Sequence, residues 1–173
     1  MKLVISIIVL QFSIVAFAQN AITSDKLTLN NGVYSYNNSV FTGKAYILDK
    51  SGVFIAEESY KNGSLHGKRI CFDSRGKIIS KEKFKNGKGK VKVFYPNGKI
   101  RYEGLVINNN ERFGSWLFYH SNGRKKAEEL WGDNGELIEE IFYNNNENID
   151  SKLIYKNSIL IKEIYFDENG IEK

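Results

Sequence analysis

The chain has 173 residues, a formal net charge of +5 at pH 7 and one cysteine. A lone cysteine excludes an internal disulfide. Cys71 lies in a strand-like run at 68–72, where we interpret it as a small buried hydrophobic residue, with a covalent dimer as the alternative. Fifteen glycines and a single proline indicate a fold rich in tight turns.

Residues 1–18 have the features of a secretory signal peptide. Met1-Lys2 is followed by an apolar run at 3–12, and the small-x-small pattern Ala16-Phe17-Ala18 precedes Gln19. The apolar run is too short for a spanning helix, so a retained anchor is the weaker interpretation. We therefore expect an exported chain, periplasmic or extracellular, that begins at Gln19.

Glycines recur at fixed intervals along the mature chain. Pairs nine residues apart are Gly43/Gly52, Gly67/Gly76, Gly89/Gly98 and Gly114/Gly123. A step of eleven residues from the second glycine then leads to Gly63, Gly87 and Asn109. Self-similarity at a period of about 20–25 residues is typical of a stacked repeat architecture.

The repeats have the pattern of β-hairpins. Segments 67–76, 89–98 and 114–123 each hold an apolar and aromatic strand that ends in a glycine turn. The returning strands are predicted at 77–84, 99–106 and 124–130. Glycine supplies the positive φ that a tight turn requires. Helical spacing is missing from these segments, so we predict an all-β fold, an elongated meander of antiparallel hairpins.

The flanking segments resemble partial repeats. We predict an entry hairpin at 19–42, the full repeats at 43–131 and degenerate C-terminal repeats or a cap at 132–173. Turns of the degenerate units are expected at 133–135, 156–158 and 168–170. Terminal repeats are atypical because they cover the open ends of a stack.

Three of these segments carry a family resemblance. Residues 60–68, 94–100 and 114–123 resemble the MORN repeat variant of bacterial proteins labelled YwqK-type antitoxins. The resemblance covers about residues 32–131, with a weaker tail to Gly170. It implies a single-layer twisted sheet of hairpins. It also implies an antitoxin-like role, from which an exported chain departs because such antitoxins act in the cytoplasm.

Charge is distributed unevenly along the chain. Residues 19–127 hold twenty Lys/Arg and eight Asp/Glu, whereas 128–173 hold four Lys and twelve Asp/Glu. The positive density peaks at alternating lysines on two neighbouring predicted strands: Lys81, Lys83, Lys85, Lys88, Lys90 and Lys92. Alternation along a strand places side chains on one face, so these six form our candidate basic binding face.

Such a face could bind the acidic surface of a protein, an anionic lipid or an anionic glycan. The plainer interpretation is that the lysines solvate the sheet and protect its edges from pairing. We do not expect nucleic acid as a partner, because no known binding motif accompanies the charge. The bipolar charge also permits weak head-to-tail self-association, which salt would weaken.

Residue patterns for catalysis are missing. His66 and His120 are interpreted as turn residues, and neither has a partner at metal-binding spacing. Adjacent glutamates such as Glu57-Glu58 point to opposite faces of a strand. The many strand aromatics are assigned to packing, with an exposed stripe for glycans or peptides as the alternative. We therefore predict no enzyme activity, no cofactor and no metal.

Two functions remain for an exported repeat protein of this kind. The first is a protein-binding module, antitoxin- or immunity-like or associated with the cell envelope. The alternative is a structural or surface protein that binds anionic lipid or glycan through its basic face, with avidity from many lysines.

Overall fold

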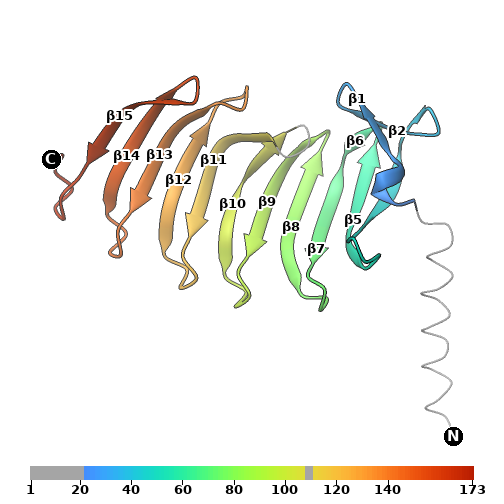
Figure 1. Cartoon of the computed structure of the whole chain (residues 1–173), viewed down its shortest axis with the longest axis horizontal. Coiled ribbons are helices and arrows are strands. Elements are labelled where there is room, and N and C mark those ends of the chain that lie inside the picture. Colours follow the sequence, from blue (N-terminus) through green and yellow to red (C-terminus); the bar gives the residue numbers. More distant parts are fainter. Residues whose placement is uncertain (1–21, 108–110) are drawn as a thin grey trace, which may run out of the picture.

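The computed structural model describes residues 22–107 and 111–173. The predicted signal peptide and the predicted turn at Asn109 lie outside these residues. Strands dominate the described chain, and an open, twisted, single-layer sheet extends along the whole molecule (Figure 1). Within 22–107 and 111–173, no helix has the length and apolar character needed to cross a membrane.

The main sheet has 12 strands, and neighbours in the chain are neighbours in the sheet. Its strands are β4 (Gly43–Leu48), β5 (Phe54–Lys61), β6 (Ser64–Leu65), β7 (Gly67–Phe72), β8 (Ile78–Lys85), β9 (Lys88–Phe94), β10 (Ile100–Ile107), β11 (Glu111–Tyr119), β12 (Lys125–Trp131), β13 (Leu137–Tyr143), β14 (Ile149–Lys156) and β15 (Ile159–Tyr165). Only the short β6 departs from this order, since it pairs with β5 beside β7. The predicted meander of antiparallel hairpins is confirmed.

The N-terminal segment is more elaborate than the single entry hairpin that we predicted. A 3-10 turn η1 (Ser24–Lys26) precedes a separate three-stranded sheet of β1 (Thr28–Asn30), β2 (Val33–Tyr36) and β3 (Ser39–Val40). The rings of Tyr34 and Phe41 pack on Tyr60 of β5, with centroids 4.8 and 5.5 Å away. This small sheet therefore covers one face of the main sheet at its first strands.

The turns follow the glycines. Gly52, Gly76, Gly98 and Gly123 all have φ between 78° and 92°, as the hairpin turns require. Asn62-Gly63 and Asn86-Gly87 have positive φ at both positions, which is the type I′ pattern. The turn at 144–148 escaped prediction, because Glu147 has a φ of 63° at the position that Gly52, Gly76, Gly98 and Gly123 occupy in their turns.

Aspartates reinforce three of these turns. One carboxylate oxygen of Asp49 accepts the backbone N–H groups of Ser51 and Val53, at 2.8 and 2.9 Å. Asp73 and Asp167 make the same pair of bonds to the residues two and four positions later. Hydrogen bonds donated to these carboxylates lower the pKa of all three. The ionised aspartate is therefore part of the folded turn.

A single layer buries its largest rings against backbone rather than against a second layer. Phe84 and Trp116 are each only 4% exposed. Phe84 lies over Gly89, its partner on the next strand, and Trp116 lies over Gly104 of β10. A methyl group at either glycine would overlap the ring. These two glycines are needed for space, since neither has a positive φ.

We therefore expect Gly104→Ala to destabilise the protein by about 1–3 kcal/mol, because the Trp116 ring must leave its place. Urea unfolding would measure the loss. In the double variant with Trp116→Leu, alanine should cost much less, since the smaller side chain leaves room. Equal costs of Gly104→Ala with and without the ring would contradict this account.

The turn aspartates predict a stability that depends on pH. A carboxyl group whose pKa is lower in the folded state adds stability above its unfolded pKa, about 4, and loses it as pH falls through the folded value. The triple variant Asp49→Asn, Asp73→Asn and Asp167→Asn should therefore lose less stability between pH 5 and pH 2.5 than the parent. Thermal melts across that range would test it, and parallel curves would refute it.

Candidate binding face

Antiparallel register allows each face of the main sheet to be followed from strand to strand. Directly opposite residues point to the same side. One side, which we call the basic face, carries the six predicted lysines on β8 and β9. The other side, the aromatic face, carries Tyr60, Phe84 and Trp116 among others.

The structure brings the six lysines together in cross-strand pairs. Lys81 lies opposite Lys92, Lys83 opposite Lys90, and Lys85 opposite Lys88. Lys68 of β7 lies opposite Lys83 and extends the group to a third strand. We did not predict Lys68, because its position beside Lys83 depends on a register that the sequence does not state. This part of the basic face thus has seven lysines on the three adjacent strands β7 to β9.

Part of this positive charge is compensated locally. Glu103 of β10 forms ion pairs with Lys92 at 2.9 Å and with Lys90 at 3.6 Å. The hydrogen bond from Lys92 and the nearby positive charges lower the pKa of Glu103. The ammonium groups of Lys81 and Lys88 lie over aromatic rings, 5.8 and 5.6 Å from their centroids.

The remainder of the charge is available to a partner. In the described part of the chain, no carboxylate lies within ion-pair distance of Lys68, Lys83 or Lys85. Like charges directly opposite each other destabilise a sheet. A partner's carboxylates or phosphates would relieve that repulsion on binding.

Two open hollows lie among the lysines. One, of about 420 Å³, has Ile70 between Lys68, Lys81 and neighbouring lysines of β8 and β9. The other, of about 250 Å³, is lined by lysines of β8 and β9 together with Leu105 and Phe113. Each combines apolar side chains with cationic ones. The face can therefore bury apolar groups of a partner while it pairs with negative charge.

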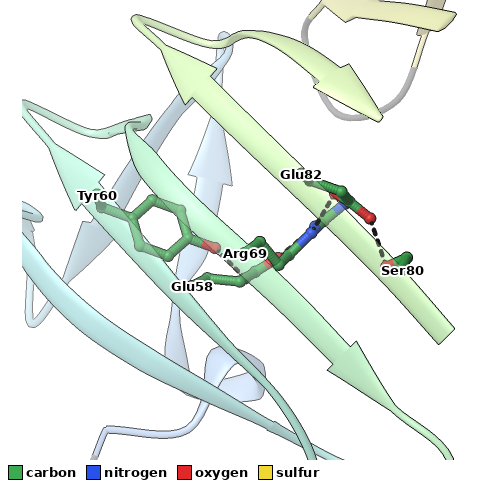
Figure 2. Close-up of polar contacts among 5 residues, drawn as sticks. All are labelled: Glu58, Tyr60, Arg69, Ser80 and Glu82. Atoms are coloured by element: carbon green, nitrogen blue, oxygen red, sulfur yellow. Dashed lines mark hydrogen bonds and ion pairs between the residues drawn. The ribbon is translucent and has the colours of Figure 1, made fainter. Parts of the chain in front are cut away.

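A buried ionic network supports these strands from the aromatic face (Figure 2). The guanidinium of Arg69 on β7 donates to Glu58 on β5 and to Glu82 on β8, both at 2.5 Å. Tyr60 donates its hydroxyl to Glu58 at 2.5 Å, and Ser80 donates to Glu82 at 3.0 Å. The Arg69 side chain is only 12% exposed.

This network cross-links three strands side to side. Arg69 also lies over the Phe84 ring, 5.1 Å from the centroid, so aromatic and carboxylate groups hold it together. Burial and the bond to Glu58 raise the pKa of Tyr60, which keeps its hydroxyl protonated as a donor. The network thereby fixes the register of β7 and β8, on which the arrangement of Lys68, Lys81 and Lys83 depends.

The residues that we considered for catalysis or metal binding, His66, Cys71 and His120, lie in different parts of the fold. His66 lies in the connection between β6 and β7, and His120 follows β11. Cys71 is half-buried on the aromatic face, where burial raises the pKa of its thiol. Over residues 22–107 and 111–173, no group of His, Cys, Asp or Glu side chains is arranged to hold a metal ion.

The strands that carry the lysines match a known repeat family. Residues 65–86 and 88–108 match the family model of the MORN repeat variant. The chain contains MORN repeats. The first matched MORN repeat comprises β7 and β8, the second β9 and β10, and together they hold all seven lysines of β7 to β9. The YwqK-type label stays a prediction.

Among solved structures, the chain is similar to part of TarM. A point mutant of S. aureus TarM in complex with fondaparinux, alpha-GlcNAc-glycerol and UDP is 16% identical, with 57% of this chain and 19% of that chain covered and a TM-score of 0.44. A second TarM structure is 17% identical, with 62% and 20% covered and a TM-score of 0.42. The chain thus spans about a fifth of the length of TarM. No curated protein matches the sequence.

The buried network predicts a large effect of one substitution. Arg69→Met leaves Glu58 and Glu82 buried without a cation, so we expect a loss of about 3–5 kcal/mol in urea unfolding. Adding Glu58→Gln and Glu82→Gln should recover much of the loss. Arg75→Met is the control, because the Arg75 side chain is 80% exposed in its pair with Asp73 and such pairs contribute about 0–1 kcal/mol. Similar losses for the Arg69→Met and Arg75→Met variants would refute the role of the network.

Proposed function

We propose that the chain is an exported, non-enzymatic repeat protein whose basic face binds an acidic surface of a protein partner. The observation that carries this proposal is the cross-strand pairing of lysines on β8 and β9, extended by Lys68 on β7. A rigid sheet presents these charges without the ordering cost of a flexible segment. Complementary charge speeds encounter and disfavours wrong partners.

The shape of the face favours a protein over a small molecule. Small ligands bind in concave sites that enclose most of their surface. The two hollows are open, and the apolar residues Ile70, Leu105 and Phe113 alternate with lysines across several strands. A protein partner would cover both hollows at once, with apolar contacts at the centre and ion pairs around them. The partner would be a toxin-like protein or a component of the cell envelope.

Binding of anionic lipid or glycan is the second candidate. The observation in its favour is the same combination of apolar and cationic side chains in each hollow, which also suits an amphiphilic anion. In this case affinity would come from many weak contacts rather than from one partner surface.

A capture experiment tests the proposed function. The mature chain from Gln19 would serve as bait for envelope and secreted fractions, at low and moderate salt. Reversal of Lys81, Lys83, Lys88 and Lys90 to Glu should abolish capture of a stoichiometric protein. The matched control reverses Lys26, Lys50, Lys126 and Lys156, which lie outside the group of seven lysines on β7 to β9 and change the net charge equally.

The outcomes separate the two candidates. A protein retained by the control and lost by the first variant supports a protein partner. Sedimentation with anionic vesicles or polysaccharide, lost in the same variant, supports lipid or glycan binding instead. Capture that persists after reversal of the four lysines would exclude the basic face from either function.

A further inference from the structure

The aromatic face repeats the geometry of the Arg69 network near the C-terminal end of the sheet, with one difference. In the network, Arg69 of β7 has Glu82 directly opposite on β8 and bonds Glu58 on β5. On the last three strands, Leu153 of β14 lies directly opposite both Glu140 of β13 and Glu163 of β15. Leu153 therefore occupies the place between two carboxylates that Arg69 fills at the other end.

The hydroxyl partners of the carboxylates are also repeated. Tyr60 donates to Glu58 two residues away, and Tyr165 donates to Glu163 with the same spacing at 2.6 Å. Tyr155 donates to Glu140. This bond, burial, and the charges of Glu140, Glu163 and Glu129 raise the pKa of Tyr155 to about 12. Glu140 and Glu163 thus both act on one hydroxyl, and an arriving cation would meet the charge of both, whereas Glu129 already pairs with Arg112.

The cation itself is the missing part. Among the residues that the structure describes, neither Glu140 nor Glu163 has a salt-bridge partner. Glu163 and Tyr165 are exposed, and Glu140, Leu153 and Tyr155 are half-buried, so a partner can reach them. The surrounding segment 128–173 has four lysines against twelve acidic residues.

A second arginine shows which cation this face accepts. Arg112 of β11 pairs with Glu129 at 2.6 Å and stacks on Trp116, 4.5 Å from the ring centroid. Arg69 likewise combines carboxylates with the Phe84 ring. On the aromatic face of the described strands, both cations held between a carboxylate and an aromatic ring are arginines, whereas Lys125 is held between Glu128 and the Tyr143 ring on the opposite face. A planar guanidinium can bond two carboxylates and stack on a ring, whereas an ammonium is a compact point charge.

We infer that Glu140, Leu153 and Glu163, flanked by Tyr155 and Tyr165, form a docking surface for an arginine side chain on a basic segment of a protein partner. The guanidinium would lie over Leu153 and bond both carboxylates, as Arg69 does between Glu58 and Glu82. The two carboxylate strands are about 9.6 Å apart, two strand spacings, in each case. This surface is on the face opposite the lysines, so the inference does not depend on the proposed function of the basic face.

Binding of octaarginine and octalysine to the mature chain, followed by isothermal titration calorimetry, tests the inference. We expect octaarginine to bind at least fivefold more tightly than octalysine. Glu140→Gln with Glu163→Gln should weaken octaarginine binding at least tenfold. The control pair Glu136→Gln and Glu168→Gln removes the same charge from nearby turns and should change binding less than threefold. Thermal melts would establish that all variants are folded.

A substitution that fills the surface gives a second readout. Leu153→Arg supplies the missing guanidinium from within the chain and should abolish the preference for octaarginine over octalysine. Leu130→Arg, which adds the same charge at an exposed position on the basic face, should leave that preference intact. Equal affinity for the two peptides in the parent protein, or equal losses in the two glutamine pairs, would overturn the inference.

Discussion

Antiparallel register between neighbouring strands is the constraint on which the other features depend. Beyond the first strands, which β1 to β3 cover, the described part of the main sheet has no second layer to position its side chains, so each residue there is placed by its partner across the strand. Register sets Phe84 over Gly89, bridges Glu58 and Glu82 through Arg69, and aligns Lys81 with Lys92. A shift of one residue in one strand would transfer its side chains to the opposite face.

The two faces of the main sheet contribute differently to stability and to binding. The aromatic face supplies stability, since Phe84 and Trp116 lie on glycine backbone and Arg69 bridges carboxylates on the two strands beside it. The basic face instead retains charge that the chain does not neutralise, which costs stability. Lys83 opposite Lys90 is tolerated because Glu103 pairs with Lys90 and because Arg69 cross-links β8 to β7 on the other face. Because one face provides the stability, the other face of the same layer can present unpaired charge for binding.

The turns were predictable from the sequence because a glycine at a fixed interval indicates a residue with positive φ, and the strands are the segments between these turns. The strands predicted at 77–84 and 99–106 lie one residue from the observed Ile78–Lys85 and Ile100–Ile107. The turn at 144–148 was missed because Glu147 adopts positive φ without a glycine, although the asparagines around it favour a turn.

Features that join strands were harder to predict than features within them. Alternation of lysines along β8 and β9 identified six residues of the basic face, since period two belongs to one strand. Lys68, the bridge through Arg69 and the separate sheet of β1 to β3 all depend on which residues lie opposite each other. That information comes from hydrogen bonding between strands and not from local sequence pattern.

The agreement between strand order and chain order has a consequence for how such a molecule can change in length. Each hairpin contacts mainly the hairpins before and after it, so its stability is set by nearest neighbours. Duplication or loss of one hairpin in the middle of the sheet would preserve both ends, with β1 to β3 still covering the first strands. The reach of the protein is therefore adjustable in steps of one hairpin, by a genetic event that leaves every remaining interface intact.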